Sequence, residues 1–156
     1  MGFTEYNENT DGGVSLMDKK TKILDEKVWA VVGATDNKDK FGYKIFKFMK
    51  DHGFTVYPVN PGVTEVLGQK CYARLQDLPE QPGVVDVVVP PKVGQQVVCD
   101  CAELGIKNVW LQPGADSDEV VAAAAQLGLN TVHHACVMTE IREKGENSNV
   151  RGGKRQ

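Results

Sequence analysis

The sequence predicts an α/β fold: a Rossmann-like three-layer sandwich built on a mainly parallel five-stranded sheet. Two observations support this prediction. Short apolar runs rich in β-branched residues recur along the chain, and segments with apolar residues at helical spacing separate them. Strands that alternate with helices form parallel sheets with right-handed crossovers and helices on both faces. With 156 residues, the chain is long enough for one such domain with a substantial core.

The first predicted strand, residues 28–32, is apolar at every position. Such a run suits a strand buried on both faces, as in a parallel sheet. Gly33, Ala34 and Thr35 follow it, and then a polar, lysine-bearing loop leads into the next helix. A glycine lets the backbone turn sharply and lets a ligand approach closely, and phosphates bind readily at helix N-termini. This strand, turn and helix therefore predict a nucleotide-type site.

The remaining elements are expected in regular alternation. Ser117 is a favourable helix N-cap, and Asp118 and Glu119 lie in the first turn, where the helix dipole favours acids. In the helix that follows the third predicted strand, one apolar face is formed by Val93, Val97, Cys101 and Leu104. The predicted strands are 55–59, 84–89, 108–111 and 130–133, the helices 42–52, 93–104 and 117–127, with a short extended piece at 71–72 and a single helical turn at 75–78.

Polar segments flank this alternation. Residues 1–24 lack apolar periodicity, and we expect a flexible or loosely docked lead-in that becomes helical near its end. The folded domain is predicted over residues 25–144, and residues 145–156 are expected to be a disordered tail. Neither end is expected to carry specific chemistry.

Composition excludes several classes of function. The formal net charge is -3 and no Lys/Arg-rich block lies inside the predicted domain, so broad nucleic-acid binding is not expected. No segment is long and apolar enough to span a bilayer, and the first residues lack the pattern of a signal peptide. The four cysteines do not show C-x-x-C spacing. We therefore expect a cytoplasmic protein with reduced cysteines and no membrane contact.

The expected binding edge lies beyond the carboxyl ends of the strands. A dinucleotide fingerprint requires G-x-G-x-x-G and an acid after the second strand. Here Thr35 stands where the second glycine should be, and the second strand ends in Val59-Asn60-Pro61 without a carboxylate. A Walker glycine-lysine motif is also missing. A nicotinamide cofactor and nucleoside-triphosphatase activity are therefore disfavoured.

Seven short motifs nevertheless occur in a characteristic order. They are Val32-Gly33-Ala34-Thr35, Lys40-Phe41-Gly42-Tyr43, Tyr57-Pro58-Val59-Asn60-Pro61, Glu65-Val66-Leu67-Gly68, Val88-Val89-Pro90-Pro91, residues 105–114 and Cys136-Val137-Met138-Thr139-Glu140. In these motifs, from about Val28 to Glu140, the chain resembles the stand-alone coenzyme A-binding proteins. That family shares the fold of the CoA-binding domain of the succinyl-CoA synthetase alpha subunit.

The resemblance implies a site for coenzyme A or an acyl-CoA. The loop after the first strand would hold the pyrophosphate through backbone N–H groups, with charge from Lys40 and a hydrogen bond from Thr35. The ends of the second and third strands would flank the adenosine portion and form the opposite wall. The implied binding residues are Gly33, Ala34, Thr35, Lys40, Phe41, Gly42, Val59, Asn60, Pro61, Val89, Pro90, Pro91, Gln112 and Gly114.

The chain departs from the family near its end. The family often reads Asp-Arg-Cys there, whereas this chain has His134-Ala135-Cys136. We find no coherent catalytic constellation and expect non-catalytic binding of coenzyme A or an acyl-CoA. The alternative is an NAD(P)- or acyl-CoA-dependent enzyme that uses Cys136 or His134. A module that docks onto an unidentified protein partner, or a homo-oligomer, also remains open.

Two adjacent histidines, His133 and His134, raise the question of a metal site. Neighbouring residues on a strand project to opposite faces, and the sequence shows no evident third ligand. We therefore expect no metal site.

Overall fold

The computed structural model describes residues 16–152. Its centre is a five-stranded sheet with the strand order β3-β2-β6-β7-β8. Every neighbouring pair is parallel, which confirms the predicted Rossmann-like sheet. The strands are β2 (Val28–Val32), β3 (Thr55–Val59), β6 (Val84–Val87), β7 (Asn108–Leu111) and β8 (Asn130–Val132).

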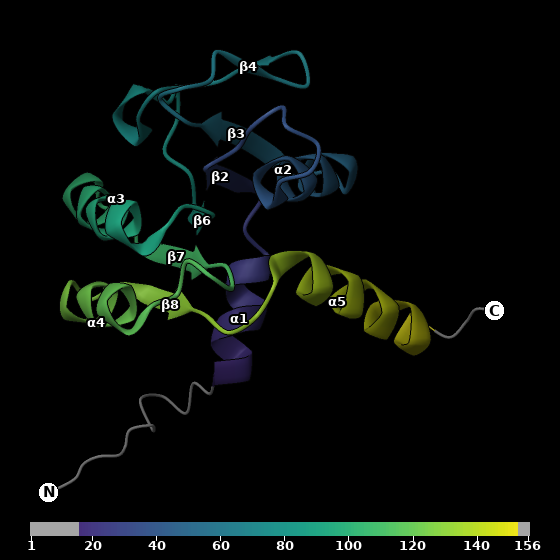
Figure 1. Ribbon diagram of the computed structural model, residues 1–156. Helices are drawn as coiled ribbons and strands as arrows, with labels where there is room; N and C mark the ends of the chain where they lie inside the picture. The colour runs from purple at the N-terminus through teal and green to yellow at the C-terminus, as the bar shows by residue number, and fades with distance from the viewer. Residues whose placement is uncertain (1–15, 153–156) are drawn as a thin grey trace, which may run out of the picture.

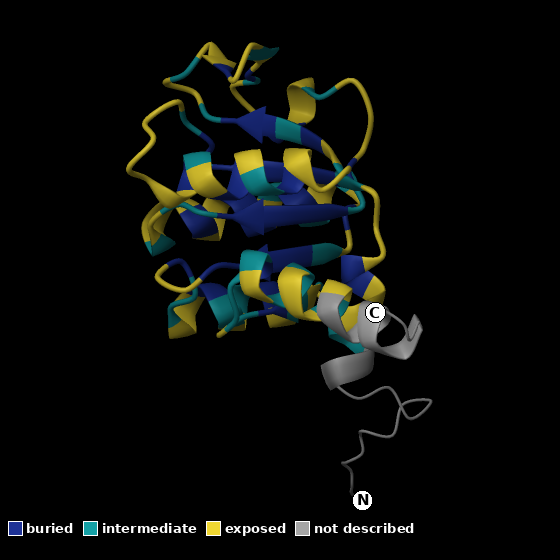
Figure 2. Ribbon diagram, turned by 90° about the vertical axis from the view of Figure 1, so that its right-hand side faces the viewer, coloured by how far each residue is buried: buried dark blue, intermediate teal, exposed yellow. Residues whose placement is uncertain are grey.

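Helices cover both faces of the sheet and complete three layers. Figure 1 shows α3 and α4 together on one side of the strands, with α2 and α5 on the other. Each helix layer packs against one face of the sheet and forms a separate hydrophobic cluster with it. The strands are therefore buried, while the outer helix faces are exposed (Figure 2). The helices are α1 (Leu16–Leu24), α2 (Phe41–Asp51), α3 (Pro91–Leu104), α4 (Asp118–Gln126) and α5 (Val137–Gly152).

The largest buried side chains belong to the layer that carries α1, α2 and α5. Trp29 and Trp110 are fully buried, and their ring centroids lie 6.1 Å apart. Their indole N–H groups donate to the carbonyls of Glu26 and Ala135. Both rings thus satisfy their polar atom while filling the core, as buried tryptophans require.

The predicted face of α3 is wrong at its first position. Val93 is 49% exposed, and the buried face is formed by Gly94, Val97, Val98 and Cys101. A Cβ on Gly94 would lie 3.6 Å from a methyl of Val87, so this small residue faces the sheet closely. The buried face of α3 therefore begins at Gly94 rather than at Val93.

Between β3 and β6 the chain forms a small hairpin that the sequence analysis did not predict. Its strands are β4 (Glu65–Val66) and β5 (Gln69–Lys70). The two turn residues, Leu67 and Gly68, have φ of 50° and 77°, which is typical of a two-residue hairpin turn with both central residues left-handed. The predicted extended piece at 71–72 is a single bridge from Tyr72 to Val59, and the predicted helical turn is a 3-10 turn at Leu75–Asp77.

Helices also occupy parts of both predicted flanking segments. In α1, Ile23 and Leu24 belong to the core, so packing begins before the predicted boundary at residue 25. Helix α5 continues to Gly152, past residue 144, where the tail was expected to begin. Met138 and Ile141 on this helix pack against the core, which explains why the helix forms. Across the described residues, we find no helix whose length and apolar character would let it cross a membrane.

Candidate functional site

The sheet has a topological switch point between β2 and β6. From β2 the chain proceeds to β3 on one side, and later to β6 on the other. Crossovers leave in opposite directions at such a point, which opens a crevice beyond the carboxyl ends of the strands. A cavity of about 560 Å³ lies there, a volume typical of small-molecule sites. Its lining comes from residues 33, 39–42, 88–91, 112–115 and 136.

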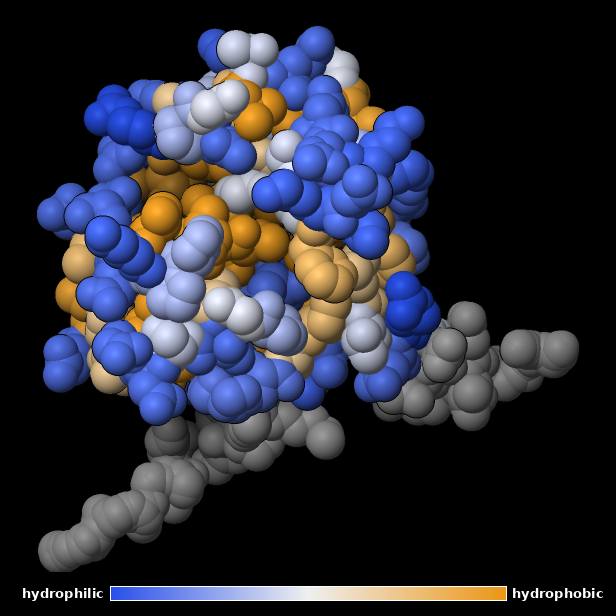
Figure 3. Space-filling view, in the orientation of Figure 1, coloured by the Kyte–Doolittle hydropathy of each residue, from blue (hydrophilic) through white to orange (hydrophobic). Residues whose placement is uncertain are grey.

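The cavity lining includes most of the residues implied by the resemblance. Those that line it are Gly33, Lys40, Phe41, Gly42, Val89, Pro90, Pro91, Gln112 and Gly114. Segments that are far apart in the sequence thus meet at one edge because their strands are parallel and adjacent. The surface in the view of Figure 1 carries a gathering of hydrophobic side chains over the region of β6, with hydrophilic side chains around it (Figure 3).

The other implied residues, Ala34, Thr35, Val59, Asn60 and Pro61, do not line this cavity. Three of them, Thr35, Val59 and Asn60, form hydrogen bonds that stabilise the loop after β2. The Asn60 amide donates to the Ala34 carbonyl at 3.0 Å, and the carbonyl of Val59 accepts from the Gly33 N–H at 2.8 Å. The Thr35 hydroxyl oxygen accepts from the N–H of Asn37 at 3.2 Å. These contacts hold the loop in shape without facing the cavity.

Two glycines bring the first loop and α2 into close contact. Gly33 has φ +106°, and a Cβ there would lie 2.6 Å from the Val88 carbonyl oxygen. A Cβ on Gly42 would lie 2.0 Å from the Gly33 carbonyl oxygen. Only glycine permits this backbone at Gly33, and only glycine lets the first turn of α2 approach so closely. The cavity wall therefore depends on both positions.

Two helix N-termini reach the cavity. Neither α2 nor α3 has a side-chain N-cap bond or an acid in its first turn. Helix α4, away from the cavity lining, has both: the Ser117 hydroxyl accepts from the N–H of Val120, and Asp118 and Glu119 follow. The first N–H groups of a helix have no acceptor within it, and they carry partial positive charge. In α2 these first N–H groups belong to Phe41 and Gly42, which both line the cavity. Helix α3 instead begins with Pro90 as its N-cap and Pro91 in its first turn, and neither proline has an N–H. The donors that suit an anion at this cavity therefore come from α2.

Several lining residues were not among the predicted binding residues. They are Asp39, Val88, Pro113, Ala115 and Cys136. Four are immediate neighbours of predicted residues in the same loops, so extending each motif by one position finds them. Cys136 belongs to the last of the seven motifs and was named as an alternative catalytic residue, but its place at the cavity depends on the fold.

Gln112 joins the third and last loops of the site. Its side chain is 4% exposed. Its Oε1 accepts from the N–H of Val137 at 2.9 Å, and its Nε2 donates to Cys136 Sγ at 3.6 Å. The first amide contact fixes the start of α5, and the second holds the thiol at the cavity wall. His134, in contrast, does not line the cavity, and its ring lies beside Asp116.

The structure corrects one premise about the two histidines. His134 has φ 62°, so the extended alternation of side chains ends before it. The ring centroids of His133 and His134 therefore lie 4.3 Å apart rather than on opposite faces.

Comparison with known proteins identifies the family of this chain. Residues 27–142 match the family described as CoA binding domain. The alpha subunit of ADP-forming acetate–CoA ligase II from Pyrococcus furiosus is 32% identical over 119 residues, which cover 69% of this chain and 26% of that protein. Uncharacterized protein YneT from Bacillus subtilis is 28% identical over 111 residues, which cover 69% of this chain and 80% of that protein.

A solved structure, described as a hypothetical protein from Pyrococcus horikoshii OT3, superimposes with a TM-score of 0.77 and 33% sequence identity. The match covers 92% of this chain and 98% of that one. The chain spans about a quarter of the length of the ligase subunit that it matches. The family match covers most of the folded region and includes every loop of the cavity. This chain therefore belongs to the CoA-binding domain family and is homologous to part of the alpha subunit of ADP-forming acetate–CoA ligase.

Proposed function

We propose that this chain binds coenzyme A or an acyl-CoA, without catalysing a reaction of its own, in the cavity at the switch point. The observation that carries the proposal is the N-terminus of α2, which has no acid in its first turn and lies, beside Lys40, at the cavity of a CoA-binding family member. Coenzyme A carries a pyrophosphate and a 3′-phosphate, so it needs donors and positive charge at one end of its site.

The N-terminus of α2 is the best candidate for the pyrophosphate. Phe41 and Gly42 line the cavity in its first turn, and the preceding Lys40 adds an ammonium group. Backbone N–H groups and a lysine together form charge-assisted hydrogen bonds to phosphate oxygens. Asp39 also lines the cavity, and its negative charge would favour the parts of the ligand that are not phosphate.

The opposite wall suits the uncharged parts of the ligand. Val88, Val89, Pro90 and Pro91 present apolar surface along the end of β6 and the start of α3. The Phe41 ring, which is 61% exposed, gives a flat apolar surface at the same site. Pantetheine and adenine both contact such surfaces favourably.

Absence of catalysis is part of the proposal and rests on the same geometry. Cys136 is held by the amide of Gln112, and the ring of His134 lies beside Asp116 rather than in the cavity. A nucleophile and its base must lie within hydrogen-bond reach of each other. These two residues are separated by Ala135 alone, yet only Cys136 lines the cavity.

Calorimetric titration of the full chain tests the binding. We expect coenzyme A to bind and NAD and NADP to bind far more weakly. Lys40→Ala should weaken coenzyme A binding by about fivefold, or about 1 kcal/mol, because one solvated charge contact is lost. The matched control is Lys107→Ala, an exposed lysine at the amino edge of the sheet. Failure of coenzyme A to bind at millimolar concentration, with NAD or NADP binding instead, would refute the proposal.

The enzyme alternative is tested on the same protein. Acyl-CoA is incubated with the wild type and with Cys136→Ala, and released thiol is measured over time. The proposal predicts no turnover by either protein. Turnover by the wild type that disappears in Cys136→Ala would establish the enzyme instead.

A further inference from the structure

We propose that Asp116, His133 and His134 form a binding site for one divalent transition-metal ion, with Zn²⁺ as the preferred ion. One ligand atom from each residue lies within 4.8 Å of the others. Two atoms bound to one tetrahedral zinc ion are about 3.4 Å apart. The widest pair therefore needs to close by no more than about 1.4 Å, a distance within the reach of side-chain rotation.

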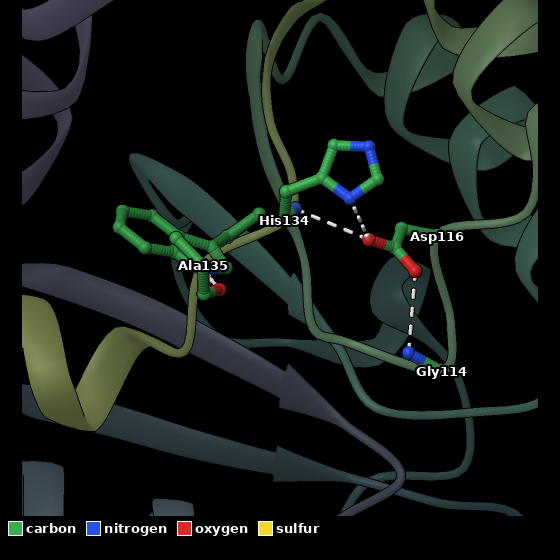
Figure 4. Close-up of polar contacts among 5 residues, drawn as sticks. Gly114, Asp116, His134 and Ala135 are labelled. Carbon is green, nitrogen blue, oxygen red and sulfur yellow. Dashed lines mark hydrogen bonds and ion pairs between the residues drawn. The ribbon is translucent and has the colours of Figure 1, made fainter.

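Asp116 is already oriented by the backbone around it. Its side chain is 13% exposed. One carboxylate oxygen accepts from the N–H of Gly114 at 3.2 Å, and the other accepts from the N–H of His134 at 3.1 Å. Figure 4 shows the carboxylate between these two donors. Hydrogen bonds of this kind orient a ligand before a metal binds, and they are typical of metal sites.

The two histidines complete the set because of the local backbone. The left-handed conformation of His134, with φ 62°, brings its ring to the same side as that of His133. His134 Nδ1 lies 3.3 Å from Asp116 Oδ2 (Figure 4). Two ligands on a tetrahedral zinc ion are separated by about 3.4 Å. His134 Nδ1 and Asp116 Oδ2 are therefore already as far apart as two ligands of one zinc ion.

His133 adds an independent observation. Within the part of the chain that the structure describes, its Nδ1 is buried and has no hydrogen-bond partner. A buried polar nitrogen without a partner is uncommon and costs free energy. Coordination through this nitrogen would give it a partner.

The ligand chemistry selects the ion. Two imidazoles and one carboxylate suit zinc and other borderline ions, whereas magnesium and calcium prefer oxygen ligands alone. Three protein ligands leave one position for water on a tetrahedral ion. The bound ion would connect the loop after β7 to the loop after β8, and both loops contribute to the cavity through Gly114 and Cys136.

Metal titration of the untagged full chain tests the site. The chain contains three histidines, so His52→Ala removes the remaining one and is the matched control. We use Co²⁺ as the spectroscopic probe and Zn²⁺ in competition with a chromophoric chelator. We expect one equivalent of Co²⁺ with visible d–d absorption, displaced by Zn²⁺, in the wild type and in His52→Ala.

The ligand variants give the decisive comparison. His133→Ala, His134→Asn and Asp116→Asn should each lose at least about 100-fold in Zn²⁺ affinity, more than loss of an outer-shell partner costs. Asparagine at 134 retains a side chain that tolerates the left-handed backbone. The melting temperature of each variant without metal shows whether it is folded. If Asp116→Asn does not fold, the Zn²⁺ affinity of His133→Ala decides the test.

Several results would overturn the proposal. These are no Co²⁺ binding by the wild type at millimolar metal, affinity unchanged in His133→Ala and His134→Asn, or an equal loss in His52→Ala. Intense thiolate-to-cobalt charge transfer would also overturn it, because it would place a cysteine in the ligand set. The coenzyme A titration is independent of all of these results, so either proposal can fail alone.

Discussion

Replacing Gly42 with alanine should disrupt the wall of the cavity while leaving the sheet intact. A Cβ at this position would lie 2.0 Å from the Gly33 carbonyl oxygen, whereas ordinary contact begins at 3.4 Å. The obstacle is backbone rather than a flexible side chain, and it belongs to the turn that follows β2. The first turn of α2 must therefore move away from Gly33, and the cavity residues at 40–42 move with it.

The cost follows from two opposing effects. Forcing an extra methyl into a packed site costs about 1–3 kcal/mol, and a rigid backbone obstacle places this substitution near the upper value. Alanine in a helix is favoured over glycine by about 1 kcal/mol. We therefore expect a net loss of about 2 kcal/mol in the free energy of unfolding, which lowers the melting temperature by about 4–8 °C in a domain of this size.

Thermal melting and coenzyme A titration on the same samples measure both consequences. We expect the lower melting temperature together with at least about tenfold weaker binding of coenzyme A, because the helix N–H groups are displaced. Gly145→Ala in α5 is the control, since its Cβ meets nothing within 4 Å. It should keep or raise stability by up to about 1 kcal/mol. Wild-type stability and wild-type binding in Gly42→Ala would refute this account of the wall.

Two further predictions concern stability. Asp86 is fully buried, neither of its carboxylate oxygens has a partner among the described residues, and burial raises its pKa well above the ordinary value. Between the pKa of an unfolded aspartate, about 3.9, and the raised folded value, unfolding releases a proton, so stability falls as pH rises. Asp86→Val should therefore be more stable than the wild type at pH 7.5, by about 1–3 kcal/mol in urea unfolding, with a smaller gain at pH 4.5; an equal gain at both pH values would contradict the assignment. Ser117→Ala should lose about 1 kcal/mol because the cap on the Val120 N–H disappears, with coenzyme A binding unchanged; a loss of binding would show that α4 contributes to the site.

The regular elements could be predicted because their signals are local. Residues 28–32 are apolar throughout, and a fully buried central strand allows no polar side to interrupt the pattern. The N-cap at Ser117 follows from its own hydroxyl and the acids after it. The hairpin at 65–70 was missed because its turn places Leu67 at φ 50°, a conformation for which leucine gives no sequence signal.

The site was predictable in its loops but not in the direction each residue faces. Gly33, Lys40 and Gly42 line the cavity, whereas the amide of Asn60 donates to the Ala34 carbonyl and supports the loop. Residues that line the cavity and residues that support the loop both lie at the carboxyl ends of the strands. Only the packing of neighbouring loops decides which residues at each strand end line the cavity.

The sequence by itself determined the parallel α/β sheet and the glycine turn after its first strand, because apolar runs, caps and glycines act through their nearest neighbours. The tertiary structure alone decided that Gln112 holds Cys136 at the cavity and that Asp116 lies beside His134. These partners come from different loops, and strand order brings them together. The backbone angle of His134, which reverses the expected separation of two adjacent rings, likewise arises from contacts that no local pattern encodes.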